Sequence, residues 1–161
     1  IYTRSLPGLE ASYREINSLG AFRIGGFVSY GDKTDLDDTV TNRAIRAYGE
    51  AYGRFQFNPY WRLTTHLRAA TDKTVTRRYD ITRDDRLRNF LNLERLDLDS
   101  YISVAGWAFQ GLRQEDVQRR IPIALPAIDA RWRLETPGVG GRLELQANSL
   151  AVLRRDGQDT Q

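Results

Sequence analysis

The sequence has 161 residues and a formal net charge of +3, and its length fits one domain or a piece of a larger one. It has no cysteine, which excludes a disulfide or a thiolate metal site within it. The single histidine, His66, excludes a multi-histidine zinc site. Acidic and basic residues are interleaved instead of forming a basic stripe, so nucleic-acid binding is not indicated. No run approaches the roughly 18 apolar residues of a spanning helix. The mean hydropathy of −0.55 fits a soluble domain or a membrane β-barrel equally.

The first half of the chain alternates apolar and polar residues at every second position, which is the pattern of β-strands with one apolar face. Strands are predicted over residues 9–16, 21–30, 44–57 and 61–70. A helix over 44–57 is disfavoured because Gly49 and Gly53 would each cost about 1 kcal/mol there. Short turn signals separate strands within pairs, whereas the polar segment 31–42 predicts a long solvated loop.

The second half repeats this pattern with longer interruptions. Strands are predicted over residues 87–96, 101–112, 128–135 and 142–153. The polar segment 71–85 predicts a long, partly extended hairpin end, and 113–120 predicts another polar connection. Pro122 and Pro126 predict an irregular lead-in over 121–127, because proline is not expected inside a paired central strand.

The segment Tyr101–Leu112 is the strand on which the interpretation of the other strands depends. One face of it carries Tyr101, Trp107 and Phe109, and the other is small or mixed. Its length fits the roughly 9–11 residues that a tilted membrane-crossing strand needs. Aromatic residues near strand ends are expected to form interfacial girdles, and they are Tyr30, Phe57, Trp61 and Tyr101.

These patterns predict an all-β fold, an antiparallel up-and-down meander of about eight strands. In a soluble β-sandwich the apolar face would be core, and in a membrane barrel it would face lipid while the charged face lines a lumen. Charged residues in mid-strand and frequent Gly and Ala on the apolar face favour the barrel. The polar residues expected to face the lumen are Arg46, Glu50, Arg54, Arg62, Arg68, Arg88, Glu94, Arg131, Arg133, Arg142 and Glu144.

No catalytic constellation, nucleophile elbow or phosphate loop is present, so we expect no enzymatic activity, no cofactor and no metal site. His66 lies among arginines and threonines and is expected to be a wall residue. The acidic pairs Asp37–Asp38 and Asp84–Asp85 are expected to be solvated loop carboxylates in preference to cation ligands. The charged row is expected mainly to pair and solvate the wall, although it could also guide anionic sugar and phosphate groups.

Three phrases follow one another from residue 70 onward: ATDKTVTRRYDI (70–81), YISVAGWAFQGLRQEDVQRRIPIALPAIDARW (101–132) and GGRLELQANSLAVLRRDGQDTQ (140–161). In this order and at similar spacing, they resemble the barrel domain of the lipopolysaccharide-assembly family LptD, also called OstA, and especially its alphaproteobacterial members. The strands before residue 70 match only in style. A generic porin would not share the ordered set.

The resemblance implies a portion of a large barrel in the Gram-negative outer membrane that assembles lipopolysaccharide in the outer leaflet. It implies an LptE-like plug lipoprotein in the lumen and an LptA-like periplasmic bridge that reaches the barrel through a β-jellyroll. The chain has no initiator methionine, no jellyroll and none of the cysteines of the family. Residues 1–161 are therefore expected to be an excerpt of the C-terminal barrel domain, without the jellyroll or the lateral-gate strands. A passive porin-like or structural barrel and a soluble β-sandwich binding module remain the alternatives.

Overall fold

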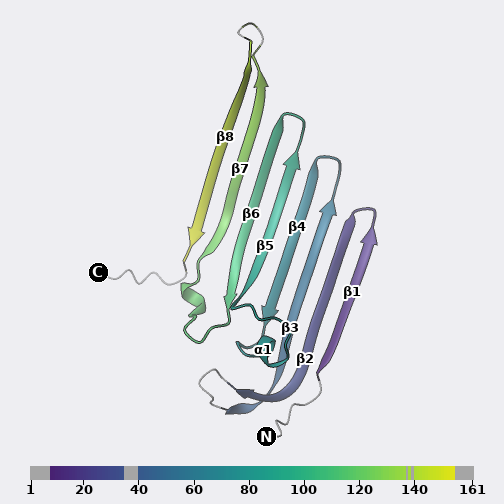
Figure 1. Cartoon of the computed structure of the whole chain (residues 1–161), viewed down its shortest axis with the longest axis vertical. Coiled ribbons are helices and arrows are strands. Elements are labelled where there is room, and N and C mark those ends of the chain that lie inside the picture. Colours follow the sequence, from purple (N-terminus) through teal and green to yellow (C-terminus); the bar gives the residue numbers. More distant parts are fainter. Residues whose placement is uncertain (1–7, 35–39, 137, 139, 155–161) are drawn as a thin grey trace, which may run out of the picture.

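Eight antiparallel strands form one sheet in chain order in the computed structural model, which describes residues 8–34, 40–136, 138 and 140–154 (Figure 1). The strands are β1 (Leu9–Asn17), β2 (Gly20–Thr34), β3 (Val40–Gln56), β4 (Trp61–Ala70), β5 (Arg86–Leu96), β6 (Ser100–Gly111), β7 (Ile123–Glu135) and β8 (Arg142–Leu153). Two short helical segments, α1 (Val75–Arg78) and η1 (Gln118–Arg120), lie in connections. The predicted all-β up-and-down meander is confirmed.

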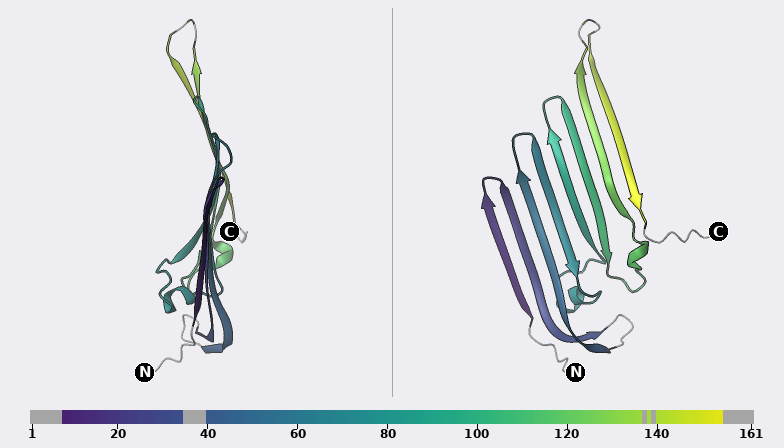
Figure 2. Two further views of the ribbon diagram at one scale, coloured as in Figure 1. Left: turned by 90° about the vertical axis from the view of Figure 1, so that its right-hand side faces the viewer. Right: turned by 180° about the vertical axis from the view of Figure 1, so that it is seen from behind.

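The sheet is a single layer, and its connections differ in length at its two ends. Seen edge-on, the strands form one thin, twisted sheet from which α1 projects on one side (Figure 2). Short turns join β1 to β2, β3 to β4, β5 to β6 and β7 to β8 at one end, which we call the short-turn end (Figure 1). The connections 71–85 and 112–122 lie at the opposite end.

The prediction of a solvated loop over 31–42 is wrong for the part that the structure describes. β2 continues to Thr34 and β3 begins at Val40, with a register shift after Asp32. Backbone pairing extends the hairpin even though the local sequence is polar, because a strand requires paired N–H and C=O groups and not apolar side chains. Residues 35–39 lie outside the described residues.

The prediction of a partly extended segment over 71–85 is also wrong. This connection forms the short helix α1 and folds back toward β3. The Asp72 carboxylate accepts hydrogen bonds from the backbone N–H groups of Thr74 and Val75, at 2.9 and 2.8 Å. An aspartate that binds the backbone two and three residues onward competes with extended structure and starts a turn.

The predicted irregular lead-in over 121–127 is wrong in extent, because β7 begins at Ile123 and includes Pro126. Pairing of β7 with β6 and with β8 shifts register at this point, so that Leu125 and Pro126 stand outside both ladders. Proline has no N–H to donate, and at a register shift none is required.

Cross-strand pairing divides the side chains into two faces. The polar face includes Glu50 and Glu94, and the apolar face includes Ile24, Leu67 and Leu145.

The aromatic side chains of β6 lie on the polar face. Tyr101 pairs with Arg131, and its hydroxyl donates a hydrogen bond to Glu94 Oε1 at 3.1 Å. Interfacial girdles border the apolar band of a barrel, so the prediction that Tyr101 belongs to such a girdle is wrong. Trp61, in contrast, stands on the apolar face beside the turn that precedes β4.

The small core lies at the end of the sheet where the long connections fold. Tyr48, Leu87 and Leu112 form a buried cluster against which Ile81 packs. Val75 of α1 is fully buried as well. No other cluster of buried hydrophobic side chains forms elsewhere in the described sheet.

We predict that Gly20→Ala destabilises the fold by about 1–3 kcal/mol. Gly20 has a φ of +149°, and an added Cβ would lie 2.1 Å from the Arg54 carbonyl oxygen across the β2–β3 pair. Gly49→Ala is the control, because a Cβ there meets nothing within 4 Å. In thermal unfolding of the purified protein in detergent, the midpoint of Gly20→Ala should be lower than that of Gly49→Ala. Equal midpoints would contradict the predicted clash with the Arg54 carbonyl oxygen.

Candidate functional site

The apolar face is uncovered across all eight described strands. Large hydrophobic side chains that are exposed on it are Leu9, Tyr13, Ile24, Val28, Tyr30, Ile45, Leu67, Leu91, Val104, Ile128, Trp132, Leu134, Leu143, Leu145 and Leu153. Soluble monomers rarely expose a contiguous apolar patch larger than a few hundred Å². Within the described residues no second layer packs on this face. A face of this kind requires an apolar medium or a partner.

The polar face carries the eleven charged residues singled out from the sequence, since the pairing register places them all on this one side. They are Arg46, Glu50, Arg54, Arg62, Arg68, Arg88, Glu94, Arg131, Arg133, Arg142 and Glu144. That this side faces a lumen stays a prediction. Eight of the eleven are arginines, so the row carries an excess of positive charge.

The register brings two pairs of the row into direct contact. Arg62 donates two hydrogen bonds to Glu94 Oε2, at 2.9 and 2.7 Å, across the β4–β5 pair. Arg133 Nε donates to Glu144 Oε1 at 3.1 Å across the β7–β8 pair. These contacts tie neighbouring strands together through side chains.

Other members of the row bind partners outside it. Arg23 pairs with Glu50 at 3.1 Å, Asp84 with Arg68 at 2.7 Å, and Asp129 with Arg131 at 2.8 Å. The sequence analysis had singled out Asp84 only as a solvated loop carboxylate, and it had not singled out Arg23 or Asp129, although their opposite charge on neighbouring strand positions was a usable signal. Among the described residues no carboxylate lies within ion-pair distance of Arg54, Arg88 or Arg142.

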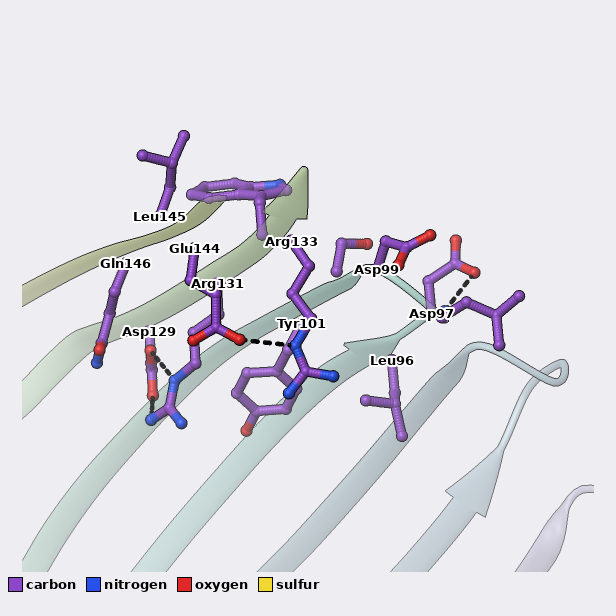
Figure 3. Close-up of a pocket in the computed structure, with 13 residues that line it drawn as sticks. Leu96, Asp97, Asp99, Tyr101, Asp129, Arg131, Arg133, Glu144, Leu145 and Gln146 are labelled. Carbon is purple, nitrogen blue, oxygen red and sulfur yellow. Dashed lines mark hydrogen bonds and ion pairs between the residues drawn. The ribbon is translucent and has the colours of Figure 1, made fainter. Parts of the chain in front are cut away.

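A hollow of about 700 Å³ opens at the short-turn end between β6, β7 and β8 (Figure 3). Figure 3 shows Arg131 and Arg133 beside Tyr101, each held by a carboxylate, with Asp97 and Asp99 at the β5–β6 turn. The Arg131 guanidinium lies 5.9 Å from the centre of the Tyr101 ring. The hollow can offer both charges and an aromatic surface to a polar group.

A row of rings crosses the polar face at one level, and the sequence reading missed it. Tyr52 pairs with His66, His66 with Phe90, and Phe90 with Trp107. The Tyr52 and His66 rings meet edge to face, 5.9 Å apart. Alternation alone could have placed each ring on a face, but the level at which the rings align depends on register.

A buried ion pair fixes the 71–85 connection onto the polar face. Arg46, fully buried, donates from Nε to Asp72 Oδ2 at 3.0 Å and from Nη2 to Asp72 Oδ1 at 2.8 Å. Its Nη2 also donates to Thr74 Oγ1 at 2.6 Å. The Tyr79 ring lies 5.7 Å from the guanidinium, and the Tyr79 hydroxyl is 2.8 Å from Ser29 Oγ. We call this group the Arg46–Asp72 anchor.

The anchor decides the protonation of Asp72. Burial by itself would raise the pKa of this carboxyl, but the hydrogen bonds from Arg46 and Thr74 outweigh it and hold the pKa below its ordinary value. Asp72 therefore stays charged near neutral pH and remains paired with Arg46.

The two long connections also bind each other. Asp85 accepts hydrogen bonds from Arg77 and Arg113, and hydrogen bonding from Arg113 holds the pKa of Asp85 below its ordinary value. Lys73 donates to backbone carbonyl oxygens of Gln114 and Asp116, at 3.2 and 2.8 Å. Segments 71–85 and 112–122 thus form one cap at this end of the sheet.

No metal centre is found in the part of the chain that the structure describes, since no three acidic or histidine side chains gather there. Asp84 and Asp85 are instead bound by arginines. The pair Asp37–Asp38 lies outside the described residues. No helix among the described residues is long and apolar enough to cross a membrane.

Comparison with known proteins gives one match. The sequence profile of the LptD family, described as "LPS transport system D", matches residues 44–161. Neither the curated proteins nor the solved structures contain a match.

We predict that Asp72→Asn weakens docking of the 71–85 connection by about 3–5 kcal/mol, because Arg46 would keep its buried charge without a counter-charge. Trypsin should then cleave faster after the exposed Arg77 and Arg78. Asp80→Asn is the matched control, since the ion pair of Asp80 with Arg83, at 3.5 Å, joins two largely exposed side chains. Equal cleavage rates for the two variants would contradict the anchor.

Proposed function

We propose that this chain, which belongs to the LptD family, forms part of the wall of an outer-membrane β-barrel that assembles lipopolysaccharide in the outer leaflet. Members of the family transport and assemble lipopolysaccharide in the outer membrane and are not enzymes. The proposal adds to this a role as a barrel translocon, with the strands of this chain as one sector of its wall.

The uncovered apolar face is the observation that carries the proposal. The eight strands have 9 to 17 residues, and a tilted strand needs about 9–11 to cross the hydrocarbon core. Only structures that satisfy their backbone hydrogen bonds internally cross a membrane, and an antiparallel sheet closed into a barrel does so. Lipid chains would cover the exposed leucines, valines and isoleucines.

The polar face would then line the lumen. Its paired charges, Arg62 with Glu94 and Arg133 with Glu144, suit a water-filled interior, where charged side chains remain solvated. Three arginines without a described carboxylate partner leave positive charge for phosphate groups of the transported glycolipid; they are Arg54, Arg88 and Arg142. For most members of the row, the proposed role is to hold the wall together.

The unpaired edges of β1 and β8 support the proposal that the chain is a sector of a larger barrel. An exposed edge presents free N–H and C=O groups, and a closed barrel has none. We place the remaining strands, the lateral gate and a periplasmic β-jellyroll in other parts of the same protein. An LptE-like plug in the lumen and an LptA-like bridge to the jellyroll are the proposed partners, and an alphaproteobacterial source is the proposed origin.

Two other functions fit less well. A soluble β-sandwich would pack its apolar face against a second sheet, but all described strands lie in one sheet. A passive porin-like barrel would have the same wall. The family match over residues 44–161 favours lipopolysaccharide assembly over this second alternative.

We predict that Ala147→Arg abolishes assembly of the full-length protein, whereas Asn148→Arg is tolerated. The two residues are neighbours in β8 and both are exposed, but Ala147 is on the apolar face and Asn148 is on the polar face opposite Asp129. An arginine facing lipid at the bilayer midplane costs about 2–4 kcal/mol.

The measurement is complementation of a depletion strain, with the heat-modifiable form in the outer membrane and surface lipopolysaccharide both quantified. Depletion without rescue should cause lipopolysaccharide to accumulate on the inner side. Normal surface lipopolysaccharide during depletion would contradict the transport function. Equal rescue by both arginine variants would contradict the lipid-facing assignment.

A further inference from the structure

The backbone ladder between β4 and β5 stops halfway along these strands. β4 pairs with β3 as far as Ala70 but with β5 only as far as His66. β5 pairs with β6 along its whole length. Segments 67–70 of β4 and 86–89 of β5 therefore face each other without strand pairing, next to the long connections. We call this interruption the β4–β5 seam.

Side-chain amides bridge the seam in place of the ladder. Asn89 Oδ1 accepts a hydrogen bond from the Arg68 N–H at 2.6 Å. Gln110, from β6, accepts from the Ala70 N–H at 2.9 Å and donates to the Ala70 carbonyl oxygen at 2.6 Å. A side-chain amide can rotate away from its partner, whereas a backbone ladder cannot, so the seam can exchange these bonds for bonds to a ligand.

A cavity of about 830 Å³ lies at the seam. Its lining includes Arg68, which belongs to the polar face, and the next residue, Ala69, which belongs to the apolar face. The cavity therefore reaches side chains on both faces of β4. Its size falls within the range of about 300–1,000 Å³ that is typical of small-ligand sites.

The cavity has an unused cationic donor. The Lys73 ammonium donates two hydrogen bonds to backbone carbonyl oxygens of the 112–122 connection. Its third N–H group remains available as a donor. Among the residues that the structure describes, no carboxylate pairs with Lys73. The lining carboxylates of Asp72 and Asp116 each already bind an arginine. An anionic oxygen is the group that this arrangement lacks.

We propose that the cavity at the β4–β5 seam binds the phosphate-bearing head group of a membrane lipid whose acyl chains lie along the apolar face. Lys73 contacts the phosphate, and the amides of Asn89 and Gln110 bind its remaining oxygens or hydroxyl groups. The small side chains of Ala69 and Ala108 leave room for the first part of the chains. This site rests on the proposed function, because it requires the apolar face to contact lipid.

The test is photo-cross-linking with the full-length protein in vesicles. A benzophenone amino acid replaces Ala108 at the seam or, as controls, Ala51 and Ala147, which stand on the apolar face in fully paired stretches. The vesicles contain equal amounts of phosphatidylglycerol and an uncharged galactolipid with the same chains. At position 108 the adducts should favour phosphatidylglycerol by about tenfold, as expected for one charge-assisted hydrogen bond. At positions 51 and 147 both lipids should react equally.

Lys73→Gln should remove the preference at position 108, and Lys73→Arg should retain it. A parallel arm with lipopolysaccharide in place of phosphatidylglycerol tells which phosphate-bearing lipid is captured, and a preference for either supports the site. The same lipid ratio at all three positions would overturn the site and leave the proposed function intact. Absence of lipid adducts at all three positions would overturn both.

Discussion

The antiparallel backbone ladder is the constraint on which the rest of the structure depends. The described sheet has no second layer, so its strands are held side by side by hydrogen bonds between neighbours and by ion pairs such as Arg62–Glu94. With the backbone satisfied in this way, each face is free to match a different medium. One face is charged and self-paired, and the other is apolar and uncovered. This division is the physical basis of the proposed wall between lipid and water.

At the end that carries the long connections, the sheet is no longer a bare single layer with two exposed faces. There the 71–85 connection is fixed on the polar face by the Arg46–Asp72 anchor, and it forms the small core with Leu87 and Leu112. Breaking such a buried pair from one side is costly, because the remaining charge has no water around it. The β4–β5 seam lies beside this cap, where side-chain amides substitute for strand pairing. The buried Arg46–Asp72 anchor and the β4–β5 seam, whose side-chain hydrogen bonds can be exchanged for bonds to a ligand, therefore lie at the same end of the sheet.

Alternation in the sequence was sufficient to predict the fold class and the strand order, because side-chain direction in a strand has a period of two. β4 begins and ends where it was predicted, at Trp61 and Ala70. The errors arose where contacts between distant residues decide the structure. Arg46 and Asp72 are 26 residues apart, and no local sequence pattern predicts their ion pair. The face of Tyr101 likewise follows from its pairing with Arg131 and not from its position near a strand end.

The claim that the apolar face meets lipid is tested most directly by a nitroxide scan along β4 of the full-length protein in bilayers, one position at a time from Leu63 to Ala70. The account predicts a period of two, with high exposure to oxygen at apolar-face positions such as Leu67 and high exposure to a water-soluble nickel chelate at polar-face positions such as His66. Apolar-face positions that are immobile and shielded from both reagents would contradict it, because such a result would mean that protein and not lipid covers this face.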